Sequence, residues 1–282
     1  MDHRIRELHG RMGRVFHQPV SVTSFTNKRV TVNYRVPLDQ VQALLPPGLE
    51  ADEIGSTGSG MVSMCACDFW VTRIGPLPVP RIRNNEMLCR ISARLRKRGR
   101  AYRTYYTLRS DASSRFLGFL GSRFSHFRKA VSDFERQDDG DTYRLQCRAT
   151  DPLCGGELAV RLAGNRAAPP RSSIFADISS ATDFVLNLDG SSGYHFPTGR
   201  LSFQRIEYPE WDTSFCHELE FDFPLLDHLI EVFAADAVFD CAIYMENVPQ
   251  RWGRSWLYRP DGSAGRPAER RTRPELGQVG PA

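Results

Sequence analysis

Short runs of β-branched and aromatic residues recur along this chain of 282 residues, and they restrict its fold more than any other feature. Such runs favour extended backbone, and Gly, Pro or Asp residues separate them. They lie at 22–25, 29–36, 60–71, 85–96, 101–110, 141–149, 156–163, 200–208 and 215–223. Helical spacing occurs instead at 38–45, 112–120, 177–188 and 224–235. This pattern predicts a mainly β or α+β fold, a large antiparallel β-barrel or sandwich with a few inserted helices.

The composition changes only near the two ends of the chain. Residues 1–20 form a basic, partly helical lead-in, and no linker divides residues 21–258, so we expect a single domain there. Over 259–282 large apolar residues almost disappear, which predicts a disordered tail. No stretch approaches the ~20 apolar residues that span a bilayer, and no signal peptide is recognisable. We therefore expect a soluble, cytoplasmic protein without a membrane partner.

The charge pattern leaves two interpretations of one basic segment. The formal net charge is only +4, but arginines are concentrated between residues 90 and 103, where they could contact the phosphates of a nucleic acid. Alternatively, Arg90, Arg94 and Arg96 share one parity of a strand whose other parity is apolar, which predicts a solvated strand face beside a buried one. The second interpretation explains the apolar alternation as well, so we expect no nucleic-acid partner.

The sequence lacks the usual signatures of nucleotide, metal and serine chemistry. It contains no P-loop, no HExxH motif, no EF-hand loop and no GxSxG motif. Cys65 and Cys67 have no second Cys/His pair at zinc-site spacing, and the odd number of seven cysteines favours free thiols. We therefore expect neither a metal nor another cofactor.

Lysine chemistry remains, because only a lysine can lose its proton near neutral pH and attack a carbonyl carbon as an amine. The chain has just three lysines, Lys28, Lys97 and Lys129, against 34 arginines. Lys129 follows an aromatic stretch whose phenylalanines are expected to wall a pocket, namely Phe116, Phe119, Phe124 and Phe127. Apolar surroundings and the adjacent charge of Arg128 would favour the neutral amine. In the alternative interpretation, Lys129 ends a surface turn and Arg128 faces water.

The run GSRFSHFRKA at 121–130 resembles the segment of acetoacetate decarboxylases that carries their Schiff-base lysine, where a glycine precedes the lysine by eight residues. Gly121 and Lys129 have this separation. Upstream, VNYRVPLDQVQALLPPGLEADE at 32–53 is similar to the family's early strand, helix and Pro-rich turn. Downstream, 184–211 resembles uncharacterised relatives of the decarboxylase. The chain is thus similar to the acetoacetate decarboxylase-like superfamily over 22–250, and most similar to its uncharacterised branch.

The resemblance implies the barrel fold of that superfamily and a set of site residues. Lys129 falls on the Schiff-base position, whereas the second, adjacent lysine of the family is Ala130 here. Glu86 falls near a family glutamate that faces the reacting group, although it could instead be a strand-end glutamate in water. Lys28 or Arg29 corresponds to a basic residue that would bind an anionic substrate group; the alternative is an edge-strand charge that discourages aggregation. A second acidic residue of the family has no equivalent.

The residues next to the lysine complete the expected substrate-binding set. Phe127 would pack on the substrate, His126 would supply a group that titrates near neutral pH, and Arg128 would place a positive charge beside the amine. Two functions remain open. One is a cofactor-free Schiff-base lyase that acts on a keto acid through Lys129, by decarboxylation or a related C–C or C–O cleavage. The other is a non-catalytic barrel that binds a small apolar ligand. A homo-oligomer is compatible with both, since oligomers are common in the resembled family.

Overall fold

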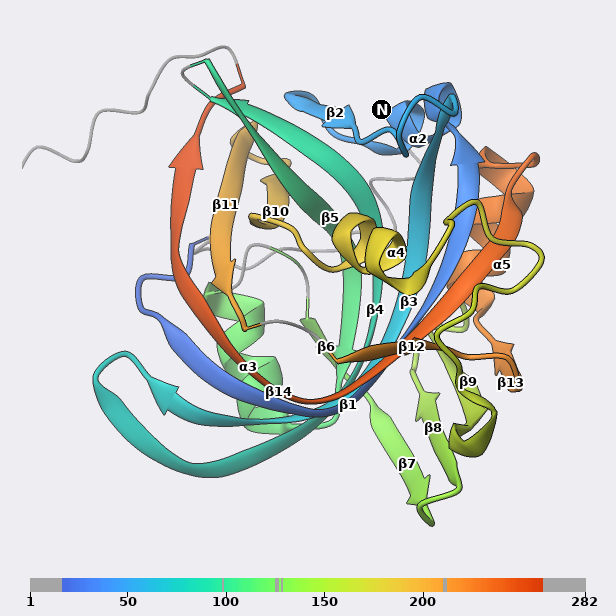
Figure 1. The fold of residues 1–282 in the computed structure, drawn as a ribbon. Helices are drawn as coiled ribbons and strands as arrows, with labels where there is room; N and C mark the ends of the chain where they lie inside the picture. The colour runs from blue at the N-terminus through green and yellow to red at the C-terminus, as the bar shows by residue number, and fades with distance from the viewer. Residues whose placement is uncertain (1–16, 98, 125–126, 128, 210–211, 261–282) are drawn as a thin grey trace, which may run out of the picture.

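The computed structural model describes residues 17–97, 99–124, 127, 129–209 and 212–260. Most of the expected lead-in and of the expected tail therefore lies outside the described residues. Figure 1 shows long strands that curve around one space, with α3 beside β6. The main sheet contains β1 Val22–Pro37, β2 Leu49–Ala51, β3 Ser59–Ile74, β4 Leu77–Lys97, β5 Arg100–Ala112, β6 Lys129–Val131, β10 Gly190–His195, β11 Arg200–Glu207, β12 Thr213–Phe215 and β14 Val238–Tyr258. A smaller sheet contains β7 Asp133–Asp138, β8 Thr142–Arg148, β9 Gly155–Arg161 and β13 Leu219–Asp222.

The main sheet closes on itself. Its strands follow the order β2-β4-β3-β1-β14-β11-β10-β5-β6, and β4 also pairs with β5. The strands from β4 through β3, β1, β14, β11 and β10 to β5 therefore form a ring, in which all pairs except β5 with β10 are antiparallel. This arrangement confirms the expected mainly β, barrel-like fold.

The helices connect and cover the strands. They are α2 Leu38–Leu44, α3 Arg115–Phe124, α4 Ile178–Val185 and α5 Pro224–Phe233, with a short 3₁₀ helix at Leu162–Gly164. All four segments with helical spacing therefore contain a helix. The helix α3 begins later than expected, because β5 continues to Ala112. The hydroxyl of Ser114 then accepts a 3.2 Å hydrogen bond from the backbone N–H of Leu117 in the first turn of the helix.

Several strands were not expected from the sequence. The most important is β14, which pairs with β1, β11 and β12. It contains Pro249 and Gly253, residue types that usually interrupt strand interiors. The expected strand at 215–223 is divided between β12 and β13. The alternation of apolar residues thus predicted most of the long strands, and β14 is the long strand that it missed.

The expected solvated face of β4 is wrong for Arg90. Its side chain is buried, with 3% exposed, and its guanidinium lies 5.1 Å from the centre of the Tyr105 ring. The cause is the curvature of β4: the even-numbered side chains in the middle of the strand face the enclosed space, so both faces of the strand are covered there. Arg94 and Arg96, nearer the strand end, pair with carboxylates at or next to β2.

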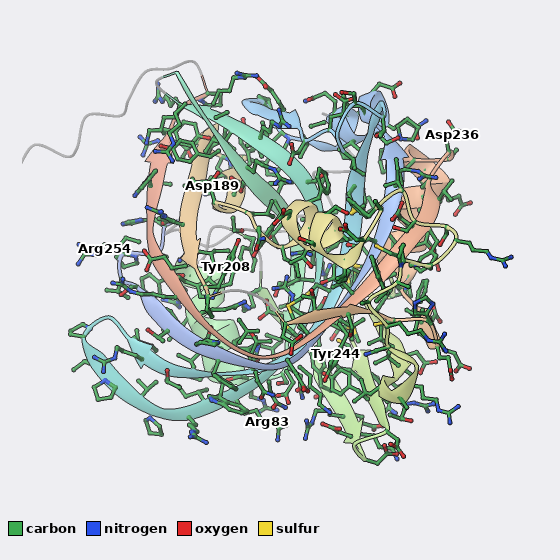
Figure 2. All side chains as sticks on the ribbon, viewed as in Figure 1. Arg83, Asp189, Tyr208, Asp236, Tyr244 and Arg254 are labelled. Atoms are coloured by element: carbon green, nitrogen blue, oxygen red, sulfur yellow. The ribbon has the colours of Figure 1, made fainter. Side chains whose placement is uncertain are left out.

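A charged network attaches the smaller sheet to the barrel. The fully buried carboxylate of Asp68 on β3 lies 2.9 Å from nitrogens of both Arg83 on β4 and Arg136 on β7. Lys28 on β1 pairs with Asp138 on β7 at 2.7 Å. Figure 2 shows Arg83 at the lower edge of the molecule in this view. The network fixes the orientation of the smaller sheet. Within it, the charge of Lys28 is neutralised by Asp138.

The chain's other global features agree with its composition. All seven cysteines are buried free thiols, as their odd number and irregular spacing predicted. Among the described residues, no helix is long and apolar enough to cross a membrane.

Candidate functional site

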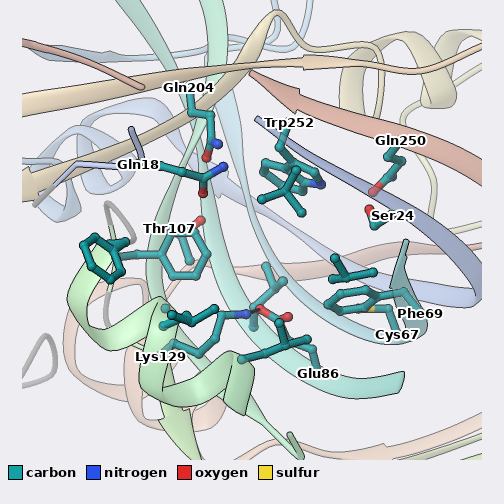
Figure 3. Close-up of a pocket in the computed structure, with 18 of the residues that line it drawn as sticks. Gln18, Ser24, Cys67, Phe69, Glu86, Thr107, Lys129, Gln204, Gln250 and Trp252 are labelled. Atoms are coloured by element: carbon teal, nitrogen blue, oxygen red, sulfur yellow. Dashed lines mark ion pairs between the residues drawn. The ribbon is translucent and has the colours of Figure 1, made fainter. Parts of the chain in front are cut away.

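A cavity of about 400 Å³ lies inside the barrel and reaches α3 (Figure 3). Most of its wall is apolar. The strands contribute Val22, Phe69, Val71, Ile74, Leu88 and Trp252, and α3 contributes Leu117, Leu120 and Phe124. A few polar side chains interrupt this wall. Such a combination of apolar walls and few polar groups is typical of a small-molecule site.

Lys129 and Glu86 meet in this cavity. Lys129 begins β6, which runs parallel to β5 and places Lys129 opposite Ser110. Its Nζ lies 2.5 Å from Oε1 of Glu86, and the two side chains are 11% and 5% exposed. The Ser110 hydroxyl donates a hydrogen bond to the same Oε1, and the Asn84 amide donates one to Oε2 at 3.2 Å. The carboxylate is thus held from two sides in direct contact with the amine, so neither residue is in bulk water.

The glycine eight residues before Lys129 has a steric role. A Cβ atom on Gly121 would lie 2.7 Å from Cδ of Lys129, and a Cβ on Gly118 would lie 2.3 Å from Cγ2 of Val131. Both glycines are on α3, one turn apart. They allow the helix to lie directly on β6, so the lysine stem passes over Gly121 before its amine reaches Glu86.

The expectation about the phenylalanines is only partly right. Phe124 and Phe127 line the cavity, and the Phe127 ring centre lies 5.5 Å from Nζ of Lys129. Phe116 and Phe119 do not line it and are 50% and 53% exposed. The reason is helical spacing, since the face of α3 toward the cavity carries Leu117, Leu120, Gly121 and Phe124. His126 and Arg128 lie outside the described residues.

A β-bulge decides which basic residue of β1 reaches the cavity. The pairing of β1 with β3 shifts by one residue between Thr26 and Lys28. Before the shift, the even-numbered Ser24 and Thr26 line the cavity; after it, the odd-numbered Arg29 does. Lys28 does not line the cavity and is directed instead to Asp138 of the smaller sheet. The sequence could not distinguish Lys28 from Arg29, because a one-residue shift exchanges the two faces of a strand.

Arg29 brings positive charge to the wall of the cavity. It is buried, and its Nε donates a hydrogen bond to Sγ of Cys65 at 2.8 Å. Burial opposes ionisation of Cys65, but a hydrogen bond with Cys67 and the charges of Arg29 and Arg90 lower the pKa of its thiol. Burial, together with the charge of Arg29, lowers the pKa of Arg90 to about 10, so this group stays charged at neutral pH.

Arg29 and Arg90 therefore leave an excess of positive charge. Within the described part of the chain, neither forms an ion pair with a carboxylate, whereas the third buried arginine, Arg109, pairs with Asp111 and Asp151. Two guanidinium groups thus surround one ionisable thiol, Cys65. An anionic group of a ligand would compensate the remaining charge.

Several residues of the cavity were not singled out from the sequence. Cys67 lies directly opposite Glu86 in the β3–β4 pairing, and Gln204, Gln250 and Trp252 enter from β11 and β14. For Gln250 and Trp252, the only available sequence signal was the alternation of apolar residues along β14, and Pro249 and Gly253 within that strand obscured it. No group of three or more His, Cys, Asp or Glu side chains in the described ranges is placed to hold a metal ion.

One protein family covers most of the chain. The model of the DUF2071 family, described as "Uncharacterized conserved protein", matches residues 25–241. No curated protein matches the chain.

Solved structures show the fold. The chain is similar to the enduracididine biosynthesis enzyme MppR complexed with pyruvate, with 13% identity, a TM-score of 0.53 and coverage of 85% of this chain and 91% of that chain. The acetoacetate decarboxylase of Legionella pneumophila is 12% identical, with a TM-score of 0.54 and coverage of 92% and 96%. An acetoacetate decarboxylase-like enzyme from Sphingomonas wittichii is 13% identical, with a TM-score of 0.52 and coverage of 86% and 94%. The chain therefore has the acetoacetate decarboxylase-like fold.

Proposed function

Since the chain belongs to the DUF2071 family and has the acetoacetate decarboxylase-like fold, we propose that it is a cofactor-free Schiff-base lyase that acts on a keto acid. One observation carries this proposal. The amine of Lys129 lies 2.5 Å from the buried carboxylate of Glu86, inside a largely apolar cavity. The resemblance of the segment around Lys129 to the Schiff-base segment of acetoacetate decarboxylases supports the same conclusion.

The contact between the two residues provides the first proton transfer. Glu86 accepts a proton from the ammonium of Lys129, and the neutral amine attacks the carbonyl carbon of the substrate. Loss of water then gives a protonated imine. This imine accepts the electron pair of a bond from the adjacent α-carbon, either to a β-carboxylate that departs as carbon dioxide or to another carbon or oxygen, whereas a carboxylate on the imine carbon itself, as in pyruvate, is retained. Protonation of the resulting enamine and hydrolysis of the imine release the product and regenerate Lys129.

The electrostatics of the wall determine which substrates fit. Arg29, which shares the Cys65 thiol with Arg90, supplies positive charge for the carboxylate of the keto acid. A carboxylate that departs as carbon dioxide would instead have to lie against the apolar wall, away from Arg29, where poor solvation favours loss of its charge. The complex of MppR with pyruvate, a keto acid, supports this substrate class.

A binding function without chemistry is the second candidate. It is favoured by Ala130, which replaces the adjacent lysine of the resembled family, and by Cys67, which places a thiol rather than a second acid beside Glu86. In this case the same cavity would hold the keto acid or an apolar ligand without forming an imine.

Borohydride reduction separates the two functions. We expect incubation with pyruvate or a larger keto acid, followed by borohydride, to add the mass of the reduced imine to the peptide that contains Lys129. Lys28 and Lys97 serve as internal controls, because the whole chain has only these two other lysines. Absence of an adduct across a panel of keto acids, with ligand binding retained in Lys129→Ala, would favour the binding protein.

Gly121→Ala tests the steric arrangement at the lysine. The added methyl group would occupy the position of the lysine stem, so we expect the rate of imine trapping at Lys129 to fall roughly tenfold. Helix propensity favours alanine by about 1 kcal/mol, so the melting temperature should not fall by much. Phe119→Ala, on the exposed face of the same helix, is the control. Unchanged trapping in Gly121→Ala would contradict the close packing of α3 on the lysine.

A further inference from the structure

The cavity has a second polar region, separate from Lys129 and Glu86. Figure 3 shows Ser24 and Gln250 together on one side of the cavity, with Lys129 and Glu86 on another. Ser24 on β1 and Gln250 on β14 are direct partners in the pairing of these strands. Thr26, two residues further along β1, lines the cavity on the same face. We call Ser24, Thr26 and Gln250 the distal polar cluster.

The distal polar cluster is buried and has no hydrogen-bond partner in the part of the protein that the structure describes. Gln250 is only 6% exposed, and Ser24 and Thr26 are also buried. Within the described residues, none of the three side chains forms a hydrogen bond to the protein, although each lines the cavity. Buried polar side chains are nearly always hydrogen-bonded, and exceptions require a reason.

The other two glutamines that line the cavity, Gln204 and Gln18, differ from Gln250 in that their side chains form hydrogen bonds to the protein backbone. The side-chain amide of Gln204 donates to the carbonyl oxygen of Gly253 at 2.8 Å, and that of Gln18 donates to the carbonyl oxygen of Val20 at 3.0 Å. Both are anchored to the backbone. Gln250 has both its amide NH₂ and its carbonyl oxygen available to a molecule in the cavity.

The surroundings of the cluster define the group that it would bind. Val71 lies opposite Ser24 and Phe69 lies opposite Thr26 in the β1–β3 pairing, and both line the cavity. The charged residues that line the described part of the cavity are Arg29, Glu86 and Lys129, none of which belongs to the cluster. A neutral group therefore fits better than an ionic one.

We propose that the distal polar cluster binds a hydroxyl group at the far end of the keto acid. The amide NH₂ of Gln250 donates to the hydroxyl oxygen, and the hydroxyl proton goes to an oxygen of Gln250, Ser24 or Thr26. The substrate would thus have a ketone at Lys129, an apolar middle along Phe69 and Val71, and a hydroxyl at the other end. The assignment of the ketone end rests on the proposed function, whereas the hydroxyl site does not require imine formation.

Matched ligands test this assignment. The probes are straight-chain 2-oxo acids of increasing length, each prepared with a terminal methyl and with a terminal hydroxyl. Binding is measured by calorimetry to the Lys129→Ala protein, which cannot form an imine. We expect the best-fitting hydroxyl acid to bind roughly tenfold more tightly than its methyl partner, and Gln250→Leu on the same background to remove that preference.

A cavity variant without a polar group provides the control. Val71→Ala should weaken both members of each pair alike, because it removes only apolar contact. Equal binding of both members at every length, or a preference that survives both Gln250→Leu and Ser24→Ala, would overturn the assignment. A hydroxyl preference without any borohydride adduct on Lys129 in the native protein would reject the lyase and retain the hydroxyl site. A Gln250→Leu protein that does not fold is replaced by Ser24→Ala, for which a smaller loss of preference is expected.

Discussion

Glu86→Gln is expected to reduce imine trapping at Lys129 at least about a hundredfold and to destabilise the protein by about 3–5 kcal/mol. The amide cannot accept and return protons while the amine attacks and water leaves, so imine formation is slowed even when the amine is neutral. It also leaves the charge of Lys129 without its partner in a cavity where both side chains are nearly excluded from water. The change is nearly isosteric, and therefore the effect reports charge rather than packing. Borohydride trapping and urea denaturation measure the two effects separately.

Two variants identify the source of the lost stability. Lys129→Met combined with Glu86→Gln removes both charges, so the double variant should be more stable than Glu86→Gln alone. Ser110→Ala removes only a hydrogen bond to the same carboxylate and should cost about 1 kcal/mol. A Glu86→Gln protein with native stability and native trapping would show that the ion pair has no functional importance.

Arg29→Met is expected to weaken the binding of pyruvate up to about a hundredfold while leaving acetone almost unaffected. The two probes share a methyl ketone and differ in the carboxylate, which Arg29 is proposed to bind. The concentration that gives half-maximal borohydride trapping at Lys129 measures both. Because Arg29 has no carboxylate partner among the described residues, its loss removes only a hydrogen bond to the Cys65 thiol, beside which the charge of Arg90 remains.

Lys28→Met is the matched control for Arg29. It removes a positive charge from the adjacent position of the same strand, but the structure directs that charge to Asp138 outside the cavity. The trapping of pyruvate should therefore remain native in Lys28→Met. An equal loss for pyruvate and acetone in Arg29→Met would indicate a general disturbance of the cavity and would exclude Arg29 as the carboxylate site.

Local sequence patterns predict much of this fold. Alternation of apolar residues predicted most strands, and helical spacing predicted the regions of the four α-helices within the described residues, because these patterns depend on residues close together in the chain. The β14 strand was missed because Pro249 and Gly253 interrupt its pattern. The burial of Arg90 was missed for a different reason: the curvature of β4 around the cavity covers a face that alternation alone assigns to solvent.

The sequence also predicted some residues of the candidate site and missed others. The aromatic, glycine-containing segment around Lys129 was sufficient to single out this lysine and to suggest Glu86 as its neighbour. The sequence could not choose between Lys28 and Arg29, because a bulge in β1 exchanges the faces of the strand. It also gave no indication of Ser24 and Gln250, which become neighbours only when β1 pairs with β14.

By itself, then, the sequence determined the type of fold and the reactive lysine, since strand periodicity and the chemistry of an amine are local properties. Only the tertiary structure decided which side chains share the cavity with that lysine. The physical reason is that strand register and β-bulges, which no short segment specifies, determine the direction of every side chain in a closed sheet.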